Sequence, residues 1–379
     1  MNNESPKHVA LLVANPKYFL SHRLPLAMAL KKSGFSVTVM TGPGKGQDTI
    51  TDLGFRWEEV VFYRGSLNPF LEIRSLYSIG RAYRKVRPEI CHHIALKPIV
   101  YGSIAAYFIP CQKILNTVAG LGHAFSGSTW KHKLIQYLVV MLFFLSCRSR
   151  KNQVVFQNPD DLAEIMKYRV LRKENTSIIL GSGVDITRFT PAPPPKNGHP
   201  SVVLPARMLK TKGVEVFVNA SKILKKRGLE PRFLLAGGLD LENKAGIPEA
   251  DLREWQQEGV VEWLGHRTDL PDIFKNADIV TLPSHYREGI PLALLEAAAC
   301  GKPIVTTDMP GCRLTVQNKK NGFLVPPQNP EKLADALEHL LKDQELRQKM
   351  GAQSRKLVEE KFSMDTINRQ YLDLYQGNL

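Results

Sequence analysis

The segment Arg287–Glu296 places two carboxylates around the predicted start of a helix. It reads R-E-G-I-P-L-A-L-L-E and follows an apolar run at 278–282. Pro291 suits the first helical position, because its missing N–H costs nothing there, and the next backbone N–H groups then have no partner within the helix. Such a helix start binds phosphate, and a carboxylate suits the vicinal diol of a sugar or ribose. We therefore predict a phosphate site between two hydroxyl-binding groups, Glu288 and Glu296.

The alternative for this segment is a structural helix with Glu296 on its solvent-exposed face. Apolar residues surround Glu296 in the stretch A-L-L-E-A-A-A. A charged side chain in such surroundings is unusual for a solvent-exposed position, and this favours the functional interpretation.

A second candidate site is the loop R-M-L-K-T-K-G at 207–213, which follows a predicted strand at 201–206. Arg207 and Lys212 are suited to clamp a diphosphate and to stabilise the charge on a leaving phosphate. A surface loop with three cations is common, so the signal is weak by itself. It gains weight because it follows a strand in the same half of the chain as Glu288.

Glycines follow other predicted strands. Gly237-Gly238, and Gly265 before His266 and Arg267, would let the backbone approach a flat ligand such as a nucleobase, although simple tight turns explain them equally well. In the first half, A-G-L-G-H at 119–123 offers His123 as a donor to a substrate hydroxyl or phosphate. A lone histidine is more often structural, so both interpretations of His123 stay open.

Both halves of the chain alternate predicted strands and helices. A helix at 24–32, ended by Gly34, lies between strand-like runs at 8–14 and 35–41, and in the second half a helix at 214–226 follows the strand at 201–206. This βαβ alternation predicts an α/β fold with two doubly wound, Rossmann-like domains. Ligands bind at the carboxyl ends of strands in such sheets, so we expect the site in a cleft where the two domains face each other.

A proline-rich segment divides the chain. The sequence P-A-P-P-P begins at Pro191, and proline at this density indicates a stiff connector. We therefore predict a first domain at 1–190, a linker at 191–197 and a second domain from 198 onward. A length of 379 residues agrees with two or three domains.

The positive charge is concentrated in the first half. Residues 1–197 carry 26 Lys and Arg against 12 Asp and Glu, a net charge of +14, whereas residues 198–379 carry 25 against 24. Such an asymmetry indicates an anionic partner, namely nucleic acid, phospholipid or a phosphorylated substrate; the alternative is a basic face that only aids solubility.

The most apolar stretch is L-I-Q-Y-L-V-V-M-L-F-F-L-S-C at 134–147. Its 14 residues are too few to cross a membrane, and basic residues flank it on both sides. We expect a partly exposed helix in the lipid interface, with a buried core helix as a nearly equal alternative.

Several classes of protein are excluded by composition and motifs. The 43% hydrophobic and 23% charged residues are ordinary globular values, which exclude a fibre or a disordered chain. Five cysteines without a CxxC pair argue against a disulfide framework or a zinc ribbon and favour a reducing compartment. We expect no signal peptide, because the run 9–14 is too short. GxGxxG, GxxxxGK[ST], GxSxG, HExxH and DxD motifs are absent.

The sequence resembles the family 4 retaining glycosyltransferases of the GT-B fold. The resemblance rests on the glutamates 288 and 296, Arg207 with Lys212-Gly213, Gly237-Gly238, residues 181–185 with Phe189, and residues 321–325. It spans the chain and is tightest from about 178 to 330. Its motifs are specific only in combination.

The resemblance implies a nucleotide-sugar site in the second domain, at 198–360, and neither a metal ion nor a cofactor. The implied catalytic residues are His123, Arg207, Lys212 and Glu288. The implied donor-binding residues are Gly237, Gly238, Arg267, Gly289, Ile290, Pro291, Leu292, Ala293 and Glu296, with Glu296 on the ribose. The C-terminal residues 361–379 would form a helix that returns to the first domain.

Within this family, Lys97-Pro98, Tyr101-Gly102 and the stretch 116–122 are similar to bacterial enzymes that extend polyprenyl-diphosphate-linked sugars. Many relatives carry a glycine-rich loop after the first strand. This sequence has N-P-K-Y-F there, so Lys17 or His22 is expected to contact the acceptor instead.

The function expected from the resemblance is transfer of a hexose or N-acetylhexosamine from a UDP-sugar to a lipid-linked glycan, with retention of configuration. The protein would lie on the inner face of the bacterial plasma membrane, held by its basic first domain, and would not bind nucleic acid. The alternatives are a nucleotide-sugar epimerase of the same fold and a non-catalytic binder of anionic lipid or nucleic acid.

Overall fold

The computed structural model describes residues 6–63, 68–125, 130–193, 199–241 and 243–377. The chain divides into two compact units. Unit 1 contains Met1–Ser182 and Ile367–Leu379, and unit 2 contains Gly183–Thr366. The sequence predicted that the first domain ends at 190 and the second at 360, whereas the units end at 182 and 366, eight residues earlier and six residues later. Of the predicted linker, residues 194–197 lie outside the described part of the chain.

Unit 1 is built on a seven-stranded sheet in the order β3-β2-β1-β4-β5-β6-β7. Every recorded strand pair in it is parallel. Its strands are β1 (His8–Leu12), β2 (Ser36–Thr41), β3 (Arg56–Glu59), β4 (Ile90–Ile94), β5 (Lys113–Val118), β6 (Asn152–Phe156) and β7 (Thr176–Ile178). A parallel sheet requires crossover connections, and helices supply them here.

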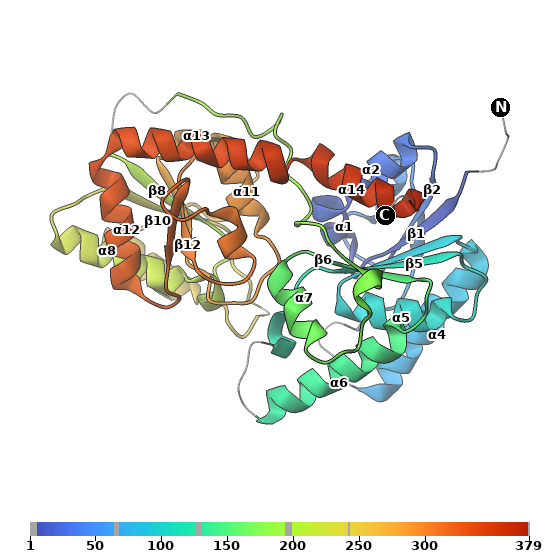
Figure 1. Ribbon diagram of the computed structural model, residues 1–379. Helices are drawn as coiled ribbons and strands as arrows, with labels where there is room; N and C mark the ends of the chain where they lie inside the picture. Colours follow the sequence, from blue (N-terminus) through green and yellow to red (C-terminus); the bar gives the residue numbers. More distant parts are fainter. Residues whose placement is uncertain (1–5, 64–67, 126–129, 194–198, 242, 378–379) are drawn as a thin grey trace. The chain divides into compact units, whose positions relative to one another are not determined.

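Helices cover both faces of this sheet (Figure 1). They are α1 (Pro16–His22), α2 (Leu24–Lys32), α3 (Gln47–Asp52), α4 (Pro69–Val86), α5 (Leu96–Ala106), α6 (Trp130–Cys147), α7 (Pro159–Met166) and the 3₁₀ helices η1 (Gly122–Phe125) and η2 (Lys173–Asn175). Strand β1 shows how one strand supplies two cores. Val9 and Leu11 pack with α1, α2 and the C-terminal helix, whereas Ala10 and Leu12 pack with α4 and α5.

The C-terminal helix α14 (Met364–Gln376) belongs to unit 1 from Ile367 onward. Ile367, Tyr371, Leu374 and Tyr375 are buried in the same cluster as the residues of β1. The phenol of Tyr375 hydrogen-bonds His92 Nδ1 on β4 at 2.6 Å. The end of the chain therefore completes the core of the unit in which the chain begins.

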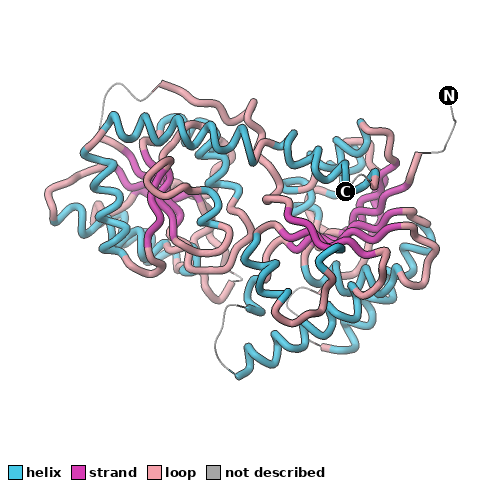
Figure 2. The backbone as a smooth tube through the Cα atoms, in the orientation of Figure 1, coloured by secondary structure: helices cyan, strands magenta, loops and turns pink. Residues whose placement is uncertain are grey.

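Unit 2 repeats the architecture, with helices around a central sheet (Figure 2). The sheet has six strands in the order β10-β9-β8-β11-β12-β13, and every recorded pair is parallel. Its strands are β8 (Ser201–Pro205), β9 (Arg232–Ala236), β10 (Glu262–Trp263), β11 (Ile279–Leu282), β12 (Ile304–Thr307) and β13 (Gly322–Val325). Its helices are α8 (Val214–Lys226), α9 (Glu249–Gln257), α10 (Leu270–Asn276), α11 (Leu292–Ala299), α12 (Pro330–Lys342), α13 (Gln344–Lys361) and the 3₁₀ helices η3 (Lys210–Lys212) and η4 (Cys312–Thr315). The predicted pair of doubly wound domains is confirmed.

The apolar helix predicted at 134–147 begins earlier, at Trp130, and it is partly exposed. Val140, Phe143 and Cys147 of α6 pack into a core with β5 and β6. Leu134, Tyr137 and Met141 on α6 are exposed. The expectation of a partly exposed helix is confirmed. No helix among the described residues is both long and apolar enough to span a membrane.

Candidate active site

The donor residues predicted in unit 2 follow the carboxyl ends of neighbouring strands. Strand β8 pairs with β11, so the loops that follow these two strands lie side by side. The backbone N–H of His285 in one loop donates to the carbonyl of Thr211 in the other at 3.1 Å. Gly213 has φ +79°, and a Cβ atom there would lie 2.2 Å from the carbonyl oxygen of Pro283. Only glycine allows this approach.

The close loops bring Lys212 and Glu288 together. Lys212 donates to Glu288 Oε2, and the two side chains are 20% and 11% exposed. The hydroxyl of Ser284 donates to Glu288 Oε1 at 2.5 Å. Because the pair is largely shielded from water, its charges interact more strongly than those of a surface pair. An ammonium group is thus held beside the residues that precede α11.

Arg207 lies on the same edge of the sheet but has a different partner. It follows β8 and donates to Asp240, which lies in the loop after β9. The Arg207 side chain is 55% exposed, so this pair contributes little stability. The sequence interpretation did not include Asp240, although it lies two residues after Gly237-Gly238.

The two glycines after β9 serve backbone packing. A Cβ atom at Gly237 would lie 1.7 Å from the carbonyl oxygen of Ala206, and one at Gly238 would lie 3.3 Å from Cβ of His266. The indole N–H of Trp263 donates to the carbonyl of Gly237 at 2.9 Å. These glycines therefore join three loops at the carboxyl edge, and their proposed contact with a nucleobase stays a prediction.

The helix start predicted at Pro291 is shifted by one residue. Pro291 is the residue that precedes α11, with φ −66° and ψ 114°, and the helix begins at Leu292. The prediction of Pro291 as the first helical residue was therefore wrong by one position. Leu292 and Ala293 form the first turn, in which backbone N–H groups have no partner within the helix. Gly311 fixes the preceding loop, since a Cβ atom there would lie 2.1 Å from the carbonyl oxygen of Gly289.

Glu296 lies on the second turn of α11 and is largely buried. Burial raises the pKa of Glu296 to about 7, and the positive charge of Arg188 partly opposes the rise. Arg188 lies in the segment that enters unit 2. A carboxyl group with this pKa is near half-protonation at neutral pH, and a strongly perturbed group is typical of a functional site.

Arg267 is placed at the periphery of the candidate site. Its guanidinium pairs with Asp269, with Nε 2.8 Å from Oδ1, and the side chain is exposed. The hydrogen bonds that Arg267 donates to Asp269, and the negative charge of that carboxylate, raise the pKa of Arg267. The structure shows no contact of Arg267 with the pair formed by Lys212 and Glu288 among the described interactions.

The predicted residues of unit 1 also follow strand ends. His123 lies on η1, after the glycines that follow β5, and its side chain is outside the described part of the structure. The backbone N–H of Leu121 in the same loop donates to Asp161 at 3.2 Å. On α1, Lys17 is exposed and His22 stacks on Tyr18 with ring centroids 4.5 Å apart. Burial, and then Arg23, lower the pKa of His22 to about 4, so His22 is neutral at pH 7.

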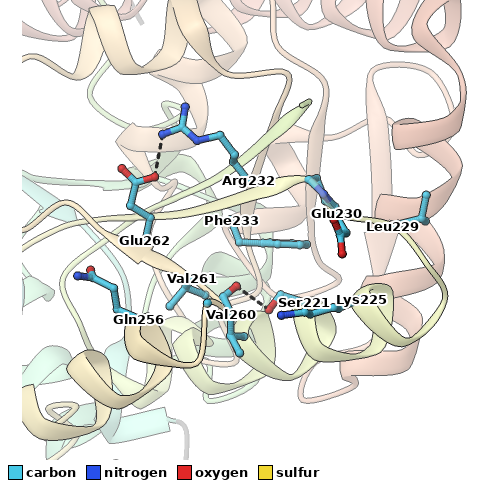
Figure 3. A pocket seen from close by; sticks show the side chains of 12 residues that line it. Ser221, Lys225, Leu229, Glu230, Arg232, Phe233, Gln256, Val260, Val261 and Glu262 are labelled. Carbon is cyan, nitrogen blue, oxygen red and sulfur yellow. Dashed lines mark hydrogen bonds and ion pairs between the residues drawn. The ribbon is translucent and has the colours of Figure 1, made fainter. Parts of the chain in front are cut away.

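Unit 2 also contains a hollow of about 510 Å³ away from these residues (Figure 3). Its lining includes Lys225 of α8 and residues at the amino ends of β9 and β10, with Arg232 paired to Glu262 at 2.7 Å. The candidate site lies at the carboxyl ends of the strands, which is the opposite edge of the sheet. Ligands of parallel sheets bind at the carboxyl edge, so the size of this hollow does not make it the active site. Among the described residues, no group of His, Cys, Asp or Glu is arranged to hold a metal ion.

Comparison with known families identifies the class of protein. A family model described as "Glycosyl transferases group 1" matches residues 185–357, and one described as "Glycosyl transferase 4-like" matches residues 8–158. The two matches together cover most of both units. The chain is a glycosyltransferase whose second unit is similar to the group 1 family and whose first unit is similar to the 4-like family.

Full-length relatives agree with this assignment. The glycosyltransferase is 29% identical over 377 residues to the N,N'-diacetylbacillosaminyl-diphospho-undecaprenol alpha-1,3-N-acetylgalactosaminyltransferase of Campylobacter jejuni, with 94% of this chain and 97% of the relative covered. It is 26% identical to the UDP-Gal:alpha-D-GlcNAc-diphosphoundecaprenol alpha-1,3-galactosyltransferase of Escherichia coli, with 73% and 72% covered. The crystal structure of Anabaena HepE with UDP and glucose is 18% identical, covers 98% of this chain and 100% of that chain, and has a TM-score of 0.77, which shows the fold. The expected GT-B fold is confirmed.

The pair formed by Lys212 and Glu288 leads to the first prediction. Lys212→Ala and Glu288→Ala should each lower kcat by at least about a hundredfold, because each removes a charged group that we predict to act on the departing diphosphate or on the sugar. Steady-state kinetics with the donor and acceptor measure this. Lys225→Ala, on the same unit but in the distant hollow, is the control. Unchanged turnover in both site variants would refute the assigned roles.

Glu296 gives a prediction for the pH dependence of stability. Its pKa in the folded protein lies above the ordinary value, so its stabilising contribution is complete below about pH 4.5 and is lost as the pH rises through about 7. Glu296→Gln cannot ionise. The free energy of unfolding of this variant, relative to the original protein, should therefore rise by roughly 2–3 kcal/mol between pH 5 and pH 8. Denaturation of both proteins at pH 5 and pH 8 measures this difference in the free energy of unfolding. The same difference at both pH values would contradict a raised pKa of Glu296.

Proposed function

We propose that this glycosyltransferase moves a hexose or N-acetylhexosamine from a UDP-sugar to a polyprenyl-diphosphate-linked glycan on the inner face of the bacterial plasma membrane. The observation that carries the proposal is the group of cations beside the start of α11 at the carboxyl edge of the unit 2 sheet, combined in one chain with exposed apolar and basic residues on unit 1. The names of the relatives from Campylobacter jejuni and Escherichia coli, which both contain a diphospho-undecaprenol acceptor, support the acceptor class.

The donor part of the proposal follows from charge at the carboxyl edge of unit 2. Lys212 and Arg207 follow strand β8, and the first turn of α11 supplies backbone donors near the same edge. A diphosphate needs cations and N–H donors together. The Escherichia coli relative is named for UDP-Gal, and the Anabaena structure contains UDP, which supports uridine as the nucleoside.

The proposed chemistry retains the configuration of the transferred sugar. The bond between the anomeric carbon and the donor phosphate breaks, and the acceptor hydroxyl forms its new bond on the same face. The proton of that hydroxyl passes to an oxygen of the leaving phosphate. Lys212 and Arg207 stabilise the charge of the departing diphosphate, Glu288 holds sugar hydroxyls and Glu296 holds the ribose. No cofactor or metal ion is included in this proposal.

The membrane part of the proposal rests on the outer face of α4 and α6, which both cover the same face of the unit 1 sheet (Figure 1). Large apolar side chains are exposed there: Phe70, Ile73 and Tyr77 on α4, and Trp130, Leu134, Tyr137, Leu138, Met141 and Leu145 on α6. We take these exposed apolar side chains, on two helices over one face of the sheet, as an interaction surface. Lys133, Arg148 and Arg150 lie beside them and favour an anionic lipid surface.

Transfer itself is the direct test of the proposed function. The purified protein is incubated with UDP-sugars and a short-chain polyprenyl-diphosphate-linked N-acetylhexosamine. We expect release of UDP and a product longer by one sugar, with retained configuration by NMR. The proposal fails if a broad panel of donors and acceptors gives no transfer. Conversion of the donor sugar without acceptor would instead indicate the epimerase.

Membrane contact is tested by co-sedimentation with vesicles that contain phosphatidylglycerol. Leu134→Asp with Leu138→Asp should reduce binding at least about tenfold, because each removes an exposed apolar side chain and adds a charge that anionic lipid repels. Met28→Asp is the matched control, since Met28 is an exposed apolar residue on α2, which packs on the opposite face of the sheet. An equal loss of vesicle binding in the double variant and in the control, or no loss in the double variant, would contradict the assignment of this surface to the membrane.

A further inference from the structure

A polar cluster in unit 1 lies at the carboxyl end of β4, outside the residues assigned above. Lys97 is in the first turn of α5, and its Nζ donates to Glu72 Oε1 on α4 at 2.8 Å and to the carbonyl of Tyr63 at 2.9 Å. The phenol of Tyr101, one turn further along α5, donates to Glu72 Oε2 at 2.5 Å. Two side chains of α5 therefore converge on one carboxylate of α4.

The backbone beneath this cluster is strained. Ala95, between β4 and α5, has φ 80° and ψ 160°, a conformation that a residue other than glycine rarely adopts. Its N–H still donates to the carbonyl of Thr117 at 3.0 Å. Helix α5 is also pressed against the strand, because a Cβ atom at Gly102 would lie 2.4 Å from the ring of His93. Strain of this kind concentrates at functional sites, where the surrounding packing maintains it.

The cluster retains unused hydrogen-bond acceptors. A carboxylate has about four lone-pair positions, and among the described residues Glu72 accepts from Lys97 and Tyr101. The phenol oxygen of Tyr101, which donates its proton to Glu72, also keeps acceptor capacity. The side chains of Glu72 and Lys97 are 18% and 32% exposed, so a solute can reach them. Such acceptors suit the hydroxyl and amide groups of a saccharide.

The position of Glu72 indicates which saccharide this is. Phe70 and Ile73, two residues before and one residue after Glu72 on α4, are 82% and 64% exposed and belong to the apolar surface assigned to the membrane. A sugar bound at Glu72 would therefore lie where its lipid carrier can remain in the bilayer. The carboxyl ends of parallel strands are also the usual place for a ligand.

We propose that Glu72, Lys97 and Tyr101 bind the terminal sugar of the lipid-linked acceptor. This site rests on the proposed function, because it names the part of unit 1 that receives that substrate. Glu72 accepts hydrogen bonds from the sugar, while Lys97 and Tyr101 hold the carboxylate in place. The alternative is a purely structural tie between α4 and α5.

The test separates a binding site from a structural tie. Glu72→Gln should raise both the KM and the Kd for a short-chain polyprenyl-diphosphate-linked N-acetylhexosamine by at least about tenfold and leave the donor KM within about twofold, because a hydrogen bond to a charged group is lost. Tyr101→Phe should raise the acceptor KM by a smaller factor. Glu58→Gln is the matched control, since Glu58 accepts from Lys85 of α4 at 2.7 Å in the same unit.

The outcomes distinguish failure of the site from failure of the proposed function. If the protein binds the polyprenyl-diphosphate-linked probe but transfers no sugar to it, the proposed function is contradicted. Equal binding of the probe by the original protein and by Glu72→Gln would overturn this site, as would a loss in Glu58→Gln equal to that in Glu72→Gln. If Glu72→Gln does not fold, an acceptor KM unchanged in Tyr101→Phe and in Lys97→Met overturns the proposal.

Discussion

The pairing of Lys212 with Glu288 is the interaction on which the account of this glycosyltransferase depends. The two residues are 76 positions apart, and they meet only because β8 and β11 are neighbours in a parallel sheet. Gly213 permits the contact, since any side chain there would collide with the carbonyl of Pro283. The pair keeps a cation and a carboxylate beside the start of α11.

The same helix connects this pair with the buried Glu296. Helix α11 presents its first turn to the loop that carries Glu288, and its second turn places a carboxyl group among apolar residues. Burial raises the pKa of that carboxyl group to about 7. The two carboxylates of this segment therefore differ in their surroundings, because Glu288 is paired with Lys212 whereas Glu296 lies among apolar residues.

The periodicity of apolar residues predicted the helices and strands well, whereas the spacing of charged residues predicted the candidate site only in part. The helices at 24–32 and 214–226 have the predicted bounds, because glycines 34 and 228 follow their ends and apolar residues recur at helical spacing. The start of α11 was predicted one residue too early, since proline is compatible both with the first helical position and with the residue before it.

The partner of Arg207 could not be predicted, because Asp240 follows a strand that is adjacent only in the folded sheet. Glu72 was missed for the same reason: its partners Lys97 and Tyr101 lie on another helix, and no sequence spacing reports that contact.

The most direct measurement is a crystal structure of the protein with an intact UDP-sugar. The account predicts that a diphosphate oxygen lies within about 3 Å of Lys212 Nζ or of a backbone N–H in the first turn of α11, with the ribose hydroxyls at Glu296. A nucleotide sugar bound at the amino edge of the unit 2 sheet, away from both residues, would contradict the account.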